Sequence, residues 1–122
     1  MNEEYTSIIK EFLSGPHAEA LEWLRASDGD KRQLGEHQST AQSVALVEQL
    51  YALGAIKVIA VAISESTDGH GASRYLLVEL PEEDRRREPL FYFEREQAEA
   101  RGFDAQPDEG QLYLFLDVKG IE

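Results

Sequence analysis

The sequence predicts an α+β protein in which helices pack on a three-stranded antiparallel sheet. Three stretches, at residues 56–63, 74–80 and 111–118, are rich in the β-branched, aromatic and aliphatic residues typical of strands. Stretches with apolar residues at helical spacing precede and separate them. The chain has 122 residues, close to the size of one domain and too short for two. We therefore expect a single domain over residues 1–122.

Two helices are predicted before the sheet. Residues 4–13 place Tyr5, Ile8, Ile9, Phe12 and Leu13 on one stripe. Gly15 suits the end of that helix, and Pro16 suits the start of the next. The second helix is expected over residues 16–26, with Trp23 packed into the core.

A loop and a third helix follow. Residues 27–37 are polar and turn-like, so we expect a loop there. Ser39 or Thr40 can cap a helix over residues 40–53, which Gly54 ends. Its expected buried stripe consists of Val44, Val47, Leu50 and Tyr51.

The first two strands are expected to form a hairpin. Residues 56–63 and 74–80 flank a turn at 66–71 that contains two glycines, so the strands should pair antiparallel. Pro81 fits a helix start, and we expect Pro89 to break that helix before it continues to Arg101.

The predicted sheet order is 2-1-3, with the third strand beside the first and the helices on one face. This arrangement is half-ferredoxin-like, with extra helices in front. Both faces of the sheet are apolar, since Ile59 and Val61 alternate with Val58 and Ala60. Either the N-terminal helices or a second subunit, as in a homodimer, should cover the second face.

The charge limits the partners. The formal net charge is −12, with 24 acidic residues against 12 basic ones, so phosphate backbones and anionic lipid surfaces are repelled. A basic protein, a cation or a neutral ligand is favoured. The basic cluster at residues 85–87 is flanked by four acids, which predicts neutralisation within the segment and no nucleic-acid binding.

Targeting signals are also missing from the pattern. A secretory signal has a basic start, then an apolar run and a cleavage site of small residues. The first residues here are acidic and lack that order, so we expect no secretory signal. The longest apolar run covers residues 58–63, far below the roughly 20 residues that span a bilayer. The chain has no cysteine, which excludes disulfides and thiolate chemistry and is compatible with a cytoplasmic location.

A candidate ligand site lies in the predicted hairpin turn. His17, His37 and His70 lack metal-binding spacing, so we expect no metal and no cofactor. His70 stands between two glycines, close to Asp68 and not far from Arg74. These three residues could offer an imidazole, a carboxylate and a guanidinium to a ligand. A solvated hairpin turn is the alternative interpretation.

A candidate partner surface lies in the acidic C-terminal third. Acids beside exposed tyrosines suit a basic protein, because tyrosine is favoured at interfaces. The candidate residues are Tyr92, Glu96, Glu99, Asp108, Glu109 and Tyr113. A solvated helix face and loop is the alternative.

The sequence therefore favours a small acidic protein-interaction or regulatory module over an enzyme, because no catalytic constellation is visible. One specific form is an inhibitor- or immunity-type protein for a basic partner. The other hypothesis is a small ligand-binding protein or enzyme that uses the His70 turn.

Overall fold

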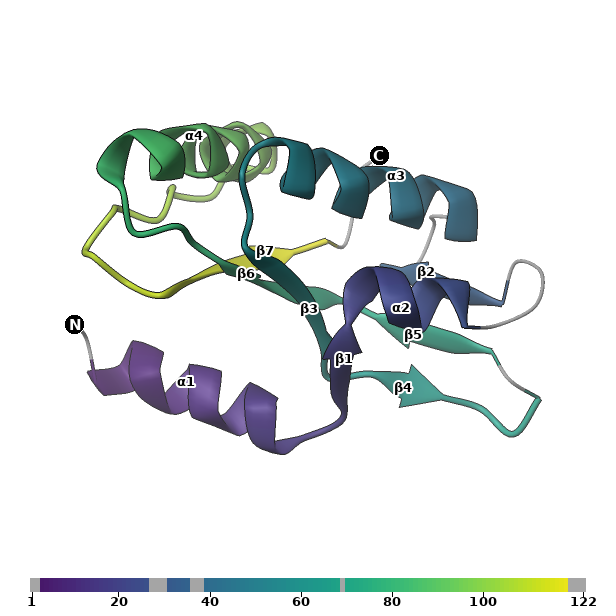
Figure 1. The fold of residues 1–122 in the computed structure, drawn as a ribbon. Coiled ribbons are helices and arrows are strands. Elements are labelled where there is room, and N and C mark those ends of the chain that lie inside the picture. The colour runs from purple at the N-terminus through teal and green to yellow at the C-terminus, as the bar shows by residue number, and fades with distance from the viewer. Residues whose placement is uncertain (1–2, 27–30, 36–38, 69, 119–122) are drawn as a thin grey trace.

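The computed structural model describes residues 3–26, 31–35, 39–68 and 70–118. Within these residues the chain forms four helices and seven strands (Figure 1). The helices are α1 (Glu3–Ser14), α2 (Ala20–Arg25), α3 (Thr40–Ala52) and α4 (Asp84–Ala100). The strands are β1 (His17–Glu19), β2 (Arg32–Leu34), β3 (Lys57–Val61), β4 (Ser64–Glu65), β5 (Gly71–Ser73), β6 (Tyr75–Glu79) and β7 (Tyr113–Asp117).

The α+β class is confirmed, and the three predicted strands form one antiparallel sheet as β3, β6 and β7. In the register, Ile59 lies opposite Leu77, which lies opposite Phe115. The sheet is larger than predicted, because β1 adds a fourth strand and the order is β1-β3-β6-β7. The described chain also contains a second, smaller sheet of order β2-β5-β4.

The predicted order 2-1-3 is wrong, and with it the half-ferredoxin-like arrangement. The third predicted strand, β7, pairs with β6 and not with β3. The outer edge of β3 is already occupied by β1, so β6 offers the open edge. After α4, the connecting segment at residues 101–112 returns the chain to the end of the sheet where β6 stops, since Tyr113 at the start of β7 lies opposite Glu79 at the end of β6. This return lets β7 run antiparallel to β6, so no split βαβ unit forms.

The predicted helix at 16–26 begins four residues late. Residues 17–19 are extended, since their backbone pairs with β3. Glu19 then caps α2, with its Oε1 accepting a hydrogen bond from the amide of Glu22 at 2.8 Å. Trp23 is 5% exposed within α2, so its predicted place in the core is confirmed.

The predicted loop at 27–37 is partly wrong. Residues 32–34 form β2 and pair in parallel with β5, a contact between segments almost 40 residues apart. Residues 27–30 and 36–38 lie outside the described residues. The predicted first strand ends at Val61 rather than at residue 63, because Ala62 has a φ of 51° that interrupts the extended backbone before β4.

The start of α3 follows the predicted cap, whereas α4 differs from what Pro89 predicts. Ser39 caps α3 in a reciprocal capping box with Gln42, as its position predicts. The expected break at Pro89 is wrong, because α4 is continuous from Asp84 to Ala100. Pro89 is exposed near the start of the helix, where its missing amide removes a single intrahelical hydrogen bond.

The sheet separates two apolar clusters, and the helices do not all lie on one face. The larger cluster packs α2, α3 and α4 against Val58, Leu76 and Leu114. On the opposite face, α1 packs Ile9 against Ile59, Val61 and Leu77 (Figure 1). The N-terminal helix thus covers the second face, which was one of the two expectations. Within the described residues, no helix has the length and apolarity to cross a membrane.

Candidate functional site

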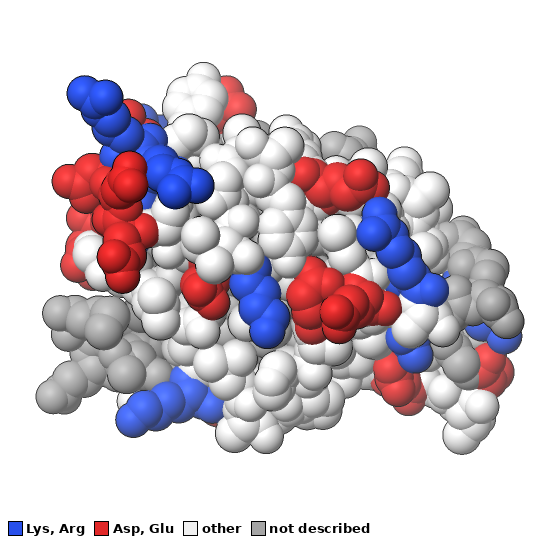
Figure 2. All heavy atoms as spheres, in the orientation of Figure 1, with Lys and Arg blue, Asp and Glu red and all other residues white. Residues whose placement is uncertain are grey.

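A groove runs between α4 and the connecting segment that follows it. It encloses about 470 Å³ and is referred to below as the α4 groove. Its walls are Asp84, Glu88, Phe91, Tyr92 and Arg95 from α4, and residues 106–108 opposite them. Phe91 is buried, whereas Tyr92 is 59% exposed. Figure 2 shows acidic side chains gathered over the start of α4, with basic ones beside them.

Arg87 holds the far wall of the α4 groove in place. Its guanidinium donates to both carboxylate oxygens of Asp108, at 3.1 and 2.8 Å. It also donates to the carbonyls of Pro81, at 3.2 Å, and Gln111, at 2.8 Å, and stacks over Phe91 at 5.6 Å. The hydrogen bond from Arg87 lowers the pKa of Asp108. Asp108 therefore presents a fixed carboxylate at neutral pH.

This pairing corrects one expectation from the sequence. Of the three arginines at 85–87, Arg87 is only 5% exposed and pairs with Asp108, 21 residues away, and not with its acidic neighbours. The position of Arg87 along the helix predicts this burial. Arg87 lies three and four residues before Leu90 and Phe91, which are both buried on α4.

Tyr92 forms the exposed aromatic wall of the α4 groove. Its hydroxyl hydrogen-bonds to the carboxylate of Glu96, one turn further along the helix, and this bond raises the pKa of Tyr92. The contact orients the ring while leaving it accessible. An exposed, oriented aromatic beside carboxylates can receive the stem and the charge of a lysine or arginine side chain.

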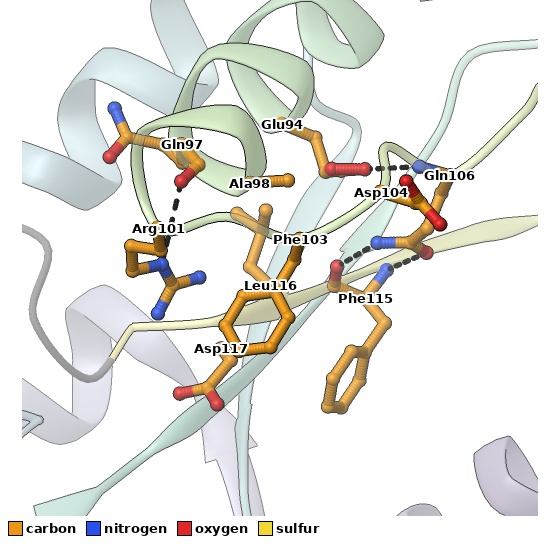
Figure 3. A pocket seen from close by; sticks show the side chains of 10 residues that line it. All are labelled: Glu94, Gln97, Ala98, Arg101, Phe103, Asp104, Gln106, Phe115, Leu116 and Asp117. Carbon is orange, nitrogen blue, oxygen red and sulfur yellow. Dashed lines mark hydrogen bonds between the residues drawn. The ribbon is translucent and has the colours of Figure 1, made fainter.

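A second hollow of about 300 Å³ lies further along the same helix and is called the Phe103 hollow (Figure 3). Residues of α4 and β7 face each other across it, and Phe103 stands at its rim with 65% of its surface exposed. Apolar contact surface comes from Ala98 and Leu116, whereas the ring of Phe115 points away and packs against Phe12 and Tyr75 in the cluster under α1. Glu94 is 4% exposed, and this burial raises its pKa.

Gln106 separates the two hollows and lines both of them. Its side-chain amide donates to the carbonyl of Phe115 at 2.6 Å and accepts from the Phe115 amide at 3.4 Å (Figure 3). Its backbone amide donates to Glu94 at 2.5 Å. The Gln106 side chain thus hydrogen-bonds to backbone groups on the outer edge of β7. Such bonds keep an edge strand from pairing with another chain.

The predicted ligand residues are only partly brought together. The Nδ1 atom of His70 lies 2.9 Å from Asp68, whose other oxygen accepts from the hydroxyl of Ser66 and, at 3.1 Å, from the His70 amide. These bonds, led by that from Ser66, lower the pKa of Asp68. Arg74 lies elsewhere, since its guanidinium grips the carboxylate of Asp117 at 2.9 to 3.3 Å.

His70 also lines a hollow of about 290 Å³ beside the small sheet. Lys31, Ser64 and Ser66 contribute nitrogen and hydroxyl groups to it, and Lys31 donates to the carbonyl of Asp68 at 3.4 Å. Within residues 3–26, 31–35, 39–68 and 70–118, no three histidine, aspartate or glutamate side chains gather in a way that could hold a metal ion.

The predicted partner residues do not gather on one surface. Tyr92 and Asp108 line the α4 groove, and Glu96 accepts a hydrogen bond from the hydroxyl of Tyr92. The amide of Glu109 donates to the Gln111 side chain at 2.8 Å in the turn beyond the groove. A further two residues stand apart from the groove lining: Glu99, near the end of α4, and Tyr113, which packs against the cluster under α1.

Sequence reasoning missed Arg87, Phe103 and Gln106. Gln106 and Phe103 lie in a segment without periodicity, so their importance depends on contacts that only the fold creates. A scan against protein-family models and searches of curated proteins and of solved structures find no match for this chain.

Proposed function

We propose that this protein is an interaction module that binds a basic protein partner through the α4 groove. The observation that carries the proposal is the composition of the groove. The carboxylates of Asp84 and Glu88 stand beside an aromatic wall made by Phe91 and Tyr92. The lining also contains Arg95 and the Asp108 carboxylate, which Arg87 binds. A lysine or arginine of the partner would lay its stem against Tyr92 and its charge among the carboxylates.

The net charge supports the same class of partner. At −12, the chain attracts basic proteins over distances up to about 10 Å at moderate salt and repels anionic ones. A second copy of the chain carries the same charge, which disfavours a homodimer through this surface. Light scattering is the direct test, and a dimeric mass would support the homodimer instead.

The groove is held in its open shape before any partner binds. Arg87 fixes Asp108 on one side, and Gln106 ties the connecting segment to β7. A preformed surface loses less conformational entropy on binding than a mobile one. This rigidity suits an inhibitor- or immunity-type protein that neutralises a basic partner in the cytoplasm, which is the specific form of the proposal.

A titration tests the proposal with a fluorescein-labelled peptide of alternating lysine and glycine as the basic probe. We expect its anisotropy to report binding that weakens as sodium chloride rises from 50 to 300 mM. Tyr92→Ala should weaken binding about tenfold, a typical loss for an interface aromatic. Glu88→Gln should weaken it severalfold.

The matched control is Glu11→Gln, which removes the same charge from an exposed position of α1 across the sheet. We expect this control to change affinity far less than Glu88→Gln. Binding that is insensitive to salt, or equal losses in Glu88→Gln and Glu11→Gln, would remove the groove from the proposal.

The hollow beside His70 supports a second candidate function, the binding of a small polar ligand or a reaction on one. The supporting observation is that His70, Lys31 and two serine hydroxyls share that hollow. The test compares the intact protein with His70→Ala in a thermal-shift screen of small anions and metabolites. A ligand that stabilises the intact protein and not His70→Ala supports this function, and identical responses remove it.

A further inference from the structure

We infer that the partner enters as an extended segment with two anchors, a basic side chain in the α4 groove and an apolar side chain in the Phe103 hollow. This inference deepens the proposed function and depends on it. The two hollows share Gln106 as a common wall, so one ligand can occupy both by passing over that side chain.

The chemistry of the two hollows differs. The α4 groove carries the exposed carboxylates of Asp84 and Glu88 beside Tyr92 and suits a cation, although Arg95 also lines it and Asp108 is bound by Arg87. The Phe103 hollow offers Ala98 and Leu116, with Phe103 exposed at its rim. Of its charged residues, Glu94 is buried, Asp117 pairs with Arg74, and Asp104 and Arg101 carry opposite charges. Tyr92 and Phe103 are, at 59% and 65%, the two most exposed large apolar side chains among the described residues, and each marks one hollow. Paired exposed aromatics of this kind are typical anchors of an interface.

The spacing of the hollows favours an extended occupant. The residues of α4 that line the two hollows are centred about seven positions apart, which is about 11 Å along a helix axis. In an extended chain, side chains on one face repeat every second residue, at about 3.3 Å per residue. Positions i and i+4, about 13 Å apart, are therefore the pair on one face that reaches both hollows, whereas i and i+2 fall short.

The size of the hollows disfavours a helix as the occupant. At about 470 and 300 Å³, each hollow has room for a side chain or two. A helix is about 10–12 Å across and would lie over the rims without filling either. An extended segment can lower single side chains into each hollow while its backbone crosses Gln106.

Four labelled twelve-residue peptides test the inference. Three have a glycine and serine background: the first carries lysine alone, the second lysine and leucine at i and i+4, and the third the same pair at i and i+2. The fourth carries the pair at i and i+7 in an alanine-rich background, which favours a helix. We expect the i, i+4 peptide to bind about tenfold tighter than the lysine-only and the i, i+2 peptides. Phe103→Ala should abolish that gain while leaving the lysine-only affinity unchanged.

Ile56→Ala is the matched control, because Ile56 is 52% exposed beside β3 and lines neither hollow. It should preserve the gain. Equal affinities for all four peptides, or a gain that survives in Phe103→Ala, would overturn the two-anchor inference while leaving the basic-partner proposal intact. Preference for the i, i+7 peptide would replace the extended segment with a helix. Failure of every peptide to bind would count against the proposed function itself.

Discussion

Replacing Arg87 by alanine should destabilise the protein more than any other change of an arginine in α4. The Arg87 side chain is 6% exposed, and its guanidinium satisfies two backbone carbonyls and both oxygens of Asp108. Alanine leaves the carbonyls of Pro81 and Gln111 without this donor and removes the group that holds the connecting segment against α4.

The magnitude follows from these contacts. Each buried acceptor left unsatisfied costs about 1–3 kcal/mol. The ion pair adds less than a fully buried one, because the Asp108 side chain is 39% exposed and can regain water. Removing one partner of a buried pair typically costs about 3–5 kcal/mol. We therefore expect the free energy of unfolding to fall by about 3–4 kcal/mol, which lowers Tm by about 12–16 °C in a domain of this size.

Thermal and urea unfolding followed by circular dichroism measure this loss. The matched control is Arg86→Ala, the neighbouring exposed position, where the arginine makes no ion pair with any described residue. The control should change the free energy of unfolding by less than about 0.5 kcal/mol. Equal small effects of both substitutions would refute the reasoning that Arg87 braces the groove.

Three further perturbations test other contacts. Gly71→Ala should lower stability by about 1–3 kcal/mol in urea unfolding, because an added Cβ would lie 3.0 Å from Trp23, whereas Gly15→Ala, with its nearest neighbours at 3.8 Å, should not. Burial raises the pKa of Tyr51 to about 12, so its contribution to stability is complete below pH 10 and is lost between pH 10 and 12. The Tm difference between the intact protein and Tyr51→Phe should therefore shrink over that range. Glu94→Gln should raise Tm at pH 7, and the gain should fade as the pH falls toward 4.5, because the raised pKa of the buried carboxyl makes its ionisation unfavourable in the folded state.

Local patterns predicted the elements whose formation depends on near neighbours. The helix α1, the cap at Ser39 and the strands β3, β6 and β7 all correspond to observed structure. Of the predicted stripe in α1, Ile9, Phe12 and Leu13 pack against the sheet, whereas Ile8 is exposed. The strand β1 was missed because three residues such as His17–Glu19 have no strand signal of their own and are ordered by pairing with β3. The same holds for β2, whose partner β5 lies almost 40 residues away.

The candidate site could be predicted only in part for the same reason. Tyr92 and Asp108 were recognised from charge and aromatic content, and the fold brings them to one groove. Their arrangement depends on Arg87 and Gln106, whose contacts span 21 and 9 residues. The buried stripe of α4 contains Arg87 and Glu94 beside Leu90 and Phe91. Charged residues at the apolar positions of a helix are the sequence pattern that points to such buried contacts.

Mapping the amide chemical shifts of the isotope-labelled protein during titration with the lysine–glycine peptide tests the central claim most directly. The α4 groove account predicts that the largest changes cluster on residues 84–95 and 106–108 and fade as salt is added. Changes centred on the turn at residues 64–71 would instead place binding at the His70 hollow. Changes spread evenly over all the acidic surfaces would mean that the groove confers no specificity, and would contradict the account.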